Sequence, residues 1–169
     1  LLKDALTFET LNLYTFISFK ERYGEFKLNS GASHVKFPQN QYICYMEEFR
    51  WYMDKEGIDM KGAKKEIDLA DSELKLEGSQ FISVHPDQDS LDFYATKGKY
   101  DLRKKIIYAD GIRFLAIADA AIFPDSGKVV VEKKAKMRPL HNARVLASST
   151  NQFHNIYNSS VNITFHISK

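Results

Sequence analysis

Histidine is the side chain best suited to metal binding in this sequence, and its spacing argues against a metal site. No two of the five histidines stand at the short interval that brings two ligands onto one ion. His154 and His166 are twelve residues apart, which could at most place them on neighbouring strands. The single cysteine, Cys44, excludes an internal disulfide, and we interpret it as a half-buried structural thiol. We therefore predict no metal site and interpret all five histidines as surface or turn residues: His34, His85, His141, His154 and His166.

Carboxylates and hydroxyl groups form no catalytic constellation either. The adjacent Glu47 and Glu48 could act as acid and base, but any pair of carboxylates meets that requirement. Asp87 and Asp89 alternate in a loop as calcium ligands do, yet the glycine and the distal glutamate of a calcium loop are missing. No nucleophile elbow, phosphate-binding loop or zinc-protease motif is present. We therefore predict a protein that is not an enzyme and has no cofactor.

A basic strip near the end of the chain could meet phosphate groups of a lipid or a nucleic acid. The strip has no aromatic side chain for base stacking, and the net charge of the whole chain is only +2, so we predict no nucleic-acid partner. The favoured interpretation is a solvated strand face whose lysines protect a sheet edge from aggregation. The strip contains Lys128, Lys133, Lys134, Lys136 and Arg138.

Two sets of apolar and aromatic side chains could form a ligand surface. The first set could line a lipid groove or fill a closed core, and the core is favoured because such residues are usually interior. The second set would be a sugar-binding platform if its tyrosines shared an exposed face. The first set is Phe49, Trp51, Met53, Phe93, Phe114 and Ile122, and the second is Tyr94, Tyr100 and Tyr108.

The elements that would position these side chains are short β-strands. The chain has 169 residues, 44% hydrophobic and 13% aromatic, which suits one soluble domain rich in strand formers. No run of about 18 apolar residues could span a bilayer. The sequence begins at Leu1 without a signal-peptide pattern and stops inside an apparent strand, so we expect a fragment of a longer protein.

Turn-forming clusters return about every twelve residues, and every second cluster has a similar composition. Short strands separated by regular turns are typical of an all-β sandwich, barrel or stacked array. The main clusters, roughly 24 residues apart, are 29–31, 54–57, 77–79, 101–105, 125–127 and 148–151. Secondary breaks occur at 38–40, 86–89, 110–111, 139 and 158–159.

Alternating hydrophobicity marks the strands between these turns. It is clear at 91–95, 107–110, 112–116, 129–131, 135–138, 145–147 and 161–165. Residues 1–23 favour strands but leave a helix open, because a short apolar run cannot be assigned by periodicity alone. Residues 41–53 could form an amphipathic helix, although alternation on both sides of 54–57 favours a hairpin.

Three segments share one pattern: 52–58, 100–106 and 123–129. Each has an aromatic residue, then an aspartate, then glycine or lysine, then a β-branched residue. The aspartate would cap the turn through backbone groups, and the glycine or lysine would sit at the bend. This repetition predicts stacked hairpins.

Longer segments around this pattern resemble a known family. Residues 49–62, 93–101 and 118–131 are similar to the "Ala-x-Tyr-Asp, turn, Val, strand, Gly" rhythm of OstA/LptA-like lipopolysaccharide-transport proteins. The resemblance covers about residues 41–165, with more lysine and less glycine in the turns than the family has. It implies a β-jellyroll of V-shaped strand pairs around an apolar groove that carries lipid. The chain is also similar to modules of large envelope proteins of Bacteroidetes-type bacteria.

These observations predict an all-β fold of stacked antiparallel hairpins, as a β-jellyroll or open β-solenoid. Residues 1–40 would hold N-terminal strands of uncertain assignment, and residues 41–169 a repeated hairpin module, within one continuous domain. The predicted function is a non-catalytic structural or partner-binding module of a bacterial cell-envelope or periplasmic protein. Its partners would be envelope proteins, further repeats of the same chain through open sheet edges, or lipid. A lipid carrier and a carbohydrate-binding domain are the alternatives.

Overall fold

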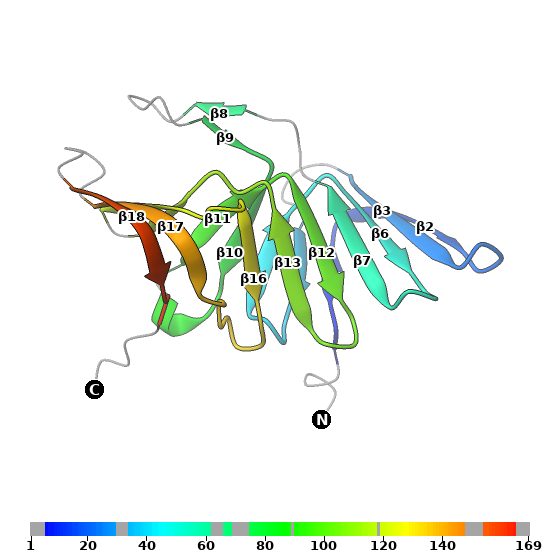
Figure 1. Ribbon diagram of the computed structural model, residues 1–169. Helices are drawn as coiled ribbons and strands as arrows, with labels where there is room; N and C mark the ends of the chain where they lie inside the picture. Colours follow the sequence, from blue (N-terminus) through cyan, green and yellow to red (C-terminus); the bar gives the residue numbers. More distant parts are fainter. Residues whose placement is uncertain are drawn as a thin grey trace.

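Two antiparallel β-sheets that face each other make up most of the molecule (Figure 1). The computed structural model describes residues 6–29, 34–61, 66–68, 75–88, 90–117, 119–147 and 154–164. Within these residues there is no α-helix, and a single 3₁₀ turn, η1, covers Pro86–Gln88. The prediction of an all-β fold is confirmed. No helix in this part of the chain has the length and apolar character needed to cross a bilayer.

Sheet A has nine strands, sheet B has seven, and a third, two-stranded sheet stands apart. In spatial order, sheet A contains β1 (Glu9–Leu11), β4 (His34–Phe37), β5 (Tyr42–Tyr45), β10 (Ser79–Ser83), β11 (Asp92–Ala95), β14 (Leu115–Ile117), β15 (Ala120–Phe123), β17 (Leu140–Ala147) and β18 (His154–Val161). Sheet B contains β16 (Lys128–Val131), β13 (Ile106–Asp110), β12 (Lys97–Asp101), β7 (Gly57–Lys61), β6 (Glu48–Tyr52), β3 (Tyr23–Leu28) and β2 (Leu13–Ser18). The third sheet pairs β8 (Glu66–Asp68) with β9 (Lys75–Glu77).

The chain places successive strand pairs alternately in the two sheets. After β1, the pair β2–β3 lies in sheet B, β4–β5 in sheet A, β6–β7 in sheet B and β10–β11 in sheet A. The alternation continues with β12–β13 in sheet B, β14–β15 in sheet A, β16 in sheet B and β17–β18 in sheet A. Where they are described, both regions left open by the sequence, 1–23 and 41–53, contain strands joined by turns and bends, and no helix.

Most of the described crossings between the sheets lie along one line, which we call the spine. β11 passes into β12 through Thr96 alone, and β15 passes into β16 around Gly127. The crossings touch one another: Ile112 donates its backbone N–H to the carbonyl of Gly127 at 3.0 Å. A Cβ added to Gly111 would lie 1.9 Å from Thr96 Oγ1, and one added to Gly78 would lie 2.2 Å from the carbonyl oxygen of Ala95. The spine therefore depends on close backbone packing.

Hairpin turns occupy the opposite ends of the strands. Four turns have four-residue loops, at 19–22, 38–41, 53–56 and 102–105. Each loop ends on a non-glycine residue with a left-handed backbone: Arg22, Gln41, Glu56 and Lys105, with φ of 59°, 54°, 45° and 59°.

The shared sequence pattern covers two kinds of connection. Segments 52–58 and 100–106 are hairpin turns of sheet B, as predicted, but 123–129 is a crossing from sheet A to sheet B. In 52–58 the predicted bend residue, Gly57, already belongs to β7, and Glu56 has the left-handed backbone of the bend. In 100–106 the prediction is confirmed, because Lys105 is the left-handed residue of the bend. The 77–79 cluster is a bend between β9 and β10 and not a hairpin turn.

The core lies between the two sheets. Phe81 and Phe93 stack from neighbouring strands of sheet A at 5.1 Å between ring centres, and Phe26 and Phe49 stack in sheet B at 4.2 Å. Alternating burial is confirmed in β11, β13 and β16, where the expected apolar residues face this core. The core also takes Phe37, Tyr42 and Tyr100, all at 0% exposure.

Three predicted alternations hold only in part, each for a local reason. At 112–116, Ile112 and Phe114 are buried as predicted, but Leu115 also faces the core and Ala116 is exposed, because the strand begins only at Leu115. Residues 135–138 do alternate in burial, but they form a tight turn and no strand. In β17, Leu146 is buried and Val145 is only half-buried, because register shifts interrupt its pairing with β18.

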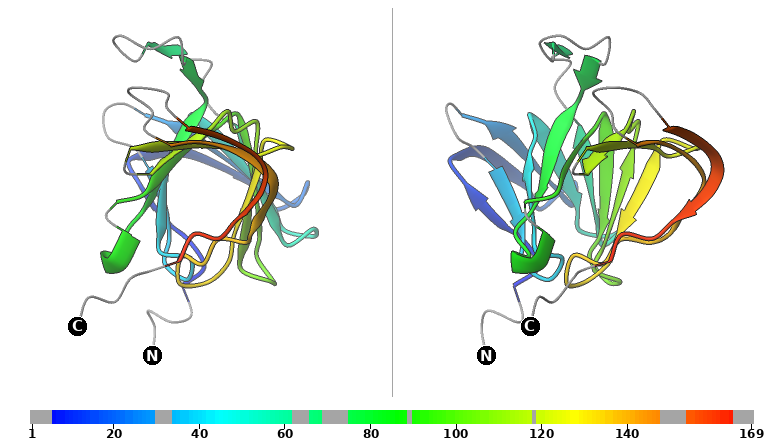
Figure 2. Two further views of the ribbon diagram at one scale, coloured as in Figure 1. Left: turned by 60° about the vertical axis from the view of Figure 1, so that its left-hand side comes forward. Right: turned by 90° about the vertical axis from the view of Figure 1, so that its left-hand side faces the viewer.

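The curved β17–β18 ribbon closes one end of the molecule (Figure 2). Its register shifts coincide with left-handed residues, Asn142 and Asn158, which bend both strands. The predicted break at 158–159 is therefore a bulge inside β18. Of the apolar residues expected at 161–165, Val161 and Ile163 pack partly against the core, and Phe165 lies outside the described residues. The turn clusters at 29–31 and 148–151 fall largely or wholly outside them too.

Candidate functional site

Among the described residues, one segment joins the two sheets on the side opposite the spine. This segment, residues 132–139, leads from the end of β16 to the start of β17, and we call it the strap (Figure 1). Ala135 and Met137 of the strap are buried at 0% and 4% exposure. Lys134 and Ala135 both have left-handed backbones, with φ of 55° and 54°, so the strap turns tightly and directs its lysines outward.

Asn40, fully buried in the turn between β4 and β5, fastens the strap to both sheets. Its Nδ2 donates to the carbonyl of Lys105 at 2.9 Å and to the carbonyl of Val131 at 3.2 Å. The backbone carbonyl of Asn40 accepts the backbone N–H of Ala135 at 2.9 Å. Gln88 of η1 adds a bond from Nε2 to the carbonyl of Ala135 at 3.0 Å. The Asn40 side chain therefore joins the β12–β13 turn to the end of β16, and the Asn40 backbone carbonyl holds the strap.

Positive charge is concentrated on the strap and on the β12–β13 turn beside it. Seven basic side chains come from these two segments, and only Asp101 and Glu132 of the same segments are acidic. The net charge of the chain is +2, so the remainder is net negative. We call this surface the basic rim: Arg103, Lys104, Lys105, Lys133, Lys134, Lys136 and Arg138.

Contacts within the basic rim show how close its parts lie. Burial lowers the pKa of Lys105, and repulsion from Lys133 lowers that pKa further. Lys105 Nζ donates to Thr7 Oγ1 at 2.7 Å. Glu132 accepts from Arg138 at 2.8 Å and lies 3.9 Å from Lys136. Lys133 and Lys134 have no ion-pair partner in the part of the chain that the structure describes.

The sequence found only part of this site. It predicted a basic strip on a strand face from Lys128 to Arg138, but Lys128 lies at the spine end of β16, 3.7 Å from Asp110. The other strip residues lie on the strap and not on a strand. Asn40 was missed, because an asparagine after Pro38 is typical of any turn.

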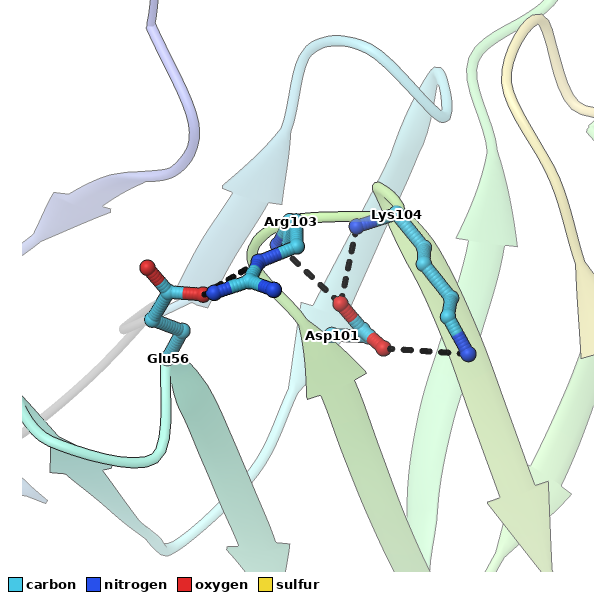
Figure 3. Close-up of polar contacts among 4 residues, drawn as sticks. All are labelled: Glu56, Asp101, Arg103 and Lys104. Carbon is cyan, nitrogen blue, oxygen red and sulfur yellow. Dashed lines mark hydrogen bonds and ion pairs between the residues drawn. The ribbon is translucent and has the colours of Figure 1, made fainter.

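A charged hollow of about 290 Å³ lies beside the basic rim, between the turns of β6–β7 and β12–β13. Arg103 Nε donates to Glu56 Oε2 at 2.6 Å across the two turns (Figure 3). Asp101 Oδ1 accepts the backbone N–H groups of Arg103 and Lys104 at 3.0 and 2.8 Å, which confirms the predicted aspartate cap. Asp101 Oδ2 lies 4.0 Å from Lys104 Nζ. The carboxylates here hold turns together, so the hollow has no uniform charge to attract a small anion.

Two comparisons with known proteins found no match. No family model matches this chain, and no curated protein matches its sequence. The resemblance to OstA/LptA-like proteins therefore remains a proposal.

The outer face of sheet B carries alternating charges across neighbouring strands. Glu25, Arg50 and Asp59 stand opposite one another on β3, β6 and β7. Glu25 and Arg50 form a hydrogen-bonded ion pair, and this bond holds the pKa of Glu25 below its usual value. Glu48 stands between Lys27 and Lys61, so it is part of this pattern, while Glu47 is exposed in the preceding bend. This face is close to neutral.

The six residues expected to line a groove or a core divide between three environments. Phe49, Phe93 and Ile122 belong to the main core, and Trp51 packs partly against it. Phe114 joins a small separate cluster with Ala121 and Leu146. Met53 is half-buried. The favoured interpretation, a closed core, therefore holds for Phe49, Phe93 and Ile122, which do not face solvent.

The tyrosines expected to form a platform do not share a surface. Tyr100 is fully buried in the core, while Tyr94 is on sheet A and Tyr108 on sheet B, both half-buried. The platform predicted for sugar binding is therefore absent.

The remaining candidates are also accounted for where they are described. Burial raises the pKa of the Cys44 thiol, which is fully enclosed and not half-buried as predicted. His85 Nδ1 accepts the backbone N–H of Asp87 at 3.1 Å and so supports the start of η1. No group of three or more metal-ligating side chains occurs within the described ranges. Asp89 and His166 lie outside them.

Proposed function

We propose that this chain is a non-catalytic, partner-binding β-module of a bacterial cell-envelope protein, built as an OstA/LptA-like β-jellyroll or open β-solenoid. The alternation of strand pairs between sheets A and B supports the fold, because it stacks hairpins in the manner of the family that the sequence resembles. The envelope location is proposed from the same resemblance.

The composition of the outermost strands is the observation that carries partner binding. β2 ends sheet B and β18 ends sheet A, and neither contains Asp, Glu, Lys, Arg or Pro. Tyr14 and Phe16 of β2 are 70% and 51% exposed, and Tyr157 of β18 is 64% exposed. Soluble proteins usually guard long edges with charges or proline, because open backbone groups recruit further strands. These edges are suited to pairing with a strand of another protein or repeat.

Sedimentation velocity over a range of protein concentrations tests this proposal on copies of the chain itself. We expect association that increases with concentration and that Phe16→Lys abolishes, because a lysine on an edge strand opposes pairing. Val84→Lys is the matched control, since Val84 is 47% exposed but lies outside the edge strands. A wild-type chain that stays monomeric at every concentration, or equal loss in both variants, would overturn the edge-pairing proposal.

A lipid carrier of the OstA/LptA type is the alternative proposal. Phe81 and Phe93 stack where an apolar groove would run, so lipid could enter there only if the sheets parted. Lipid that co-purifies and is seen by native mass spectrometry would favour the carrier. An empty chain whose Trp51 fluorescence does not respond to added lipopolysaccharide would count against it.

A further inference from the structure

We propose that the basic rim binds the surface of an anionic lipid bilayer, so that the strap and the adjoining turn contact the charged headgroups. This inference goes beyond the proposed edge pairing, because it concerns a different part of the molecule and different chemistry. It rests on the position of the charges, on their exposure, and on an apolar side chain beside them.

The charges lie where one plane could touch them together. The β12–β13 turn and the strap are both at the strand ends opposite the spine, and Asn40 bonds to each of them. Their side chains are largely exposed, although each also approaches a carboxylate: Arg103 is 78% exposed, Lys104 65% and Lys136 70%. Each lysine or arginine held close to an anionic leaflet adds to the attraction, and such contacts need no fixed geometry.

The chemistry of the rim favours a bilayer over a nucleic acid or a small anion. The rim holds five lysines, which act as mobile point charges, and no aromatic side chain that could stack on a base. The hollow beside it is lined by equal numbers of acidic and basic residues, so a small anion would gain little net attraction there: Asp54, Glu56 and Asp101 with Lys55, Arg103 and Lys104. Leu6 is 42% exposed next to Thr7, which bonds to Lys105, and could enter the headgroup boundary.

The rest of the surface would set the orientation of the bound molecule. The outer face of sheet B pairs opposite charges across strands and offers little attraction. The rim itself, as the structure describes it, has seven basic and two acidic side chains. The bound protein would therefore stand with its strand ends toward the bilayer and with β2 free at one side.

Co-sedimentation with vesicles tests the proposal on the whole chain. The probe is phosphatidylcholine vesicles with and without phosphatidylserine, at low and at physiological ionic strength. We expect binding only to the anionic vesicles, and weaker binding as salt screens the charges. Lys133→Gln with Lys134→Gln should weaken the partition coefficient about 30-fold, from roughly 1 kcal/mol for each charge near the surface.

The matched control is Lys61→Gln with Lys97→Gln. These exposed lysines stand directly opposite each other on the outer face of sheet B, and their replacement changes the net charge equally. The control should bind like the wild type, and circular dichroism should show both double variants folded. Equal weakening in both variants, no binding to anionic vesicles at low salt, or binding to duplex DNA in place of vesicles would each overturn the proposal.

Discussion

Replacing Asn40 by alanine should loosen the start of the strap next to Val131 and destabilise the whole fold, although the backbone carbonyl of residue 40 can still accept from Ala135. The change removes two hydrogen bonds, to the carbonyls of Lys105 and Val131, and leaves both oxygens without this donor. Each lost bond is worth about 1 kcal/mol net, and a buried carbonyl left unpaired costs about 1–3 kcal/mol. Alanine also removes the buried Asn40 Oδ1, which has no hydrogen-bond partner among the described residues, and this offsets part of the loss. We expect the free energy of unfolding to fall by about 2–3 kcal/mol.

Urea denaturation followed by Trp51 fluorescence measures this change, since Trp51 packs partly against the main core. The midpoint should fall while the slope stays constant, because the surface exposed on unfolding is nearly unchanged. The melting temperature should drop by about 4–12 °C for a chain of this size. Trypsin should also cleave after Lys133 and Lys134 faster than in the wild type, because both lie on the loosened strap.

Two further variants make the test specific. Asn155→Ala changes an exposed asparagine of β18 and should alter stability by less than about 0.5 kcal/mol. Asn40→Asp keeps the size but removes both donor hydrogens, so at neutral pH it should cost more than alanine. Burial raises the pKa of the introduced carboxyl, so this extra loss should shrink as the pH falls through that pKa. An Asn40→Ala variant as stable as the Asn155→Ala control would refute the role given to Asn40.

Two other outcomes are expected. Gly78→Ala should lower the free energy of unfolding by about 2 kcal/mol or more, because φ is 105° and the new Cβ would meet the Ala95 carbonyl. Gly57→Ala has room for the new Cβ and should be neutral or slightly stabilising in the same urea assay. Burial raises the pKa of Cys44 above 9.0 and that of Tyr100 above 10.0, so stability should hold below about pH 9 and fall as the pH rises further. Tyr100→Phe should flatten the part of this fall above pH 10, and an unchanged slope in that variant would contradict the assignment.

Local patterns predicted the strands well because alternation is a property of the strand itself. The hairpin of β6 and β7 and the inward faces of β11, β13 and β16 followed from period-2 hydrophobicity. The pattern at 135–138 misled for a physical reason: a tight turn with two left-handed residues also buries every second side chain. Burial of every second residue alone therefore cannot distinguish a strand from a tight turn.

Turn composition could not predict which sheet receives the next strand. Glu56, Lys105 and Gly127 all adopt left-handed backbones, with φ of 45°, 59° and 62°, yet two of them close hairpins and one lies in a crossing. The difference arises from packing between distant segments, such as Gly127 against Ile112. The sequence could not predict the role of Asn40 either, because its side chain binds carbonyls 65 and 91 residues away along the chain.

The two sides of the molecule are constrained to different degrees, and this difference locates its functional surfaces. At the spine, Gly78 lies against the backbone of Ala95 and Gly111 against the side chain of Thr96, so even one added methyl group would displace a crossing. At the hairpin turns, left-handed positions hold arginine, glutamine, glutamate and lysine, which shows that these loops accept bulky polar side chains. Binding residues can therefore change at the turns and the strap without disturbing the core. The basic rim is on this tolerant side, and Asn40 keeps it in place from beneath.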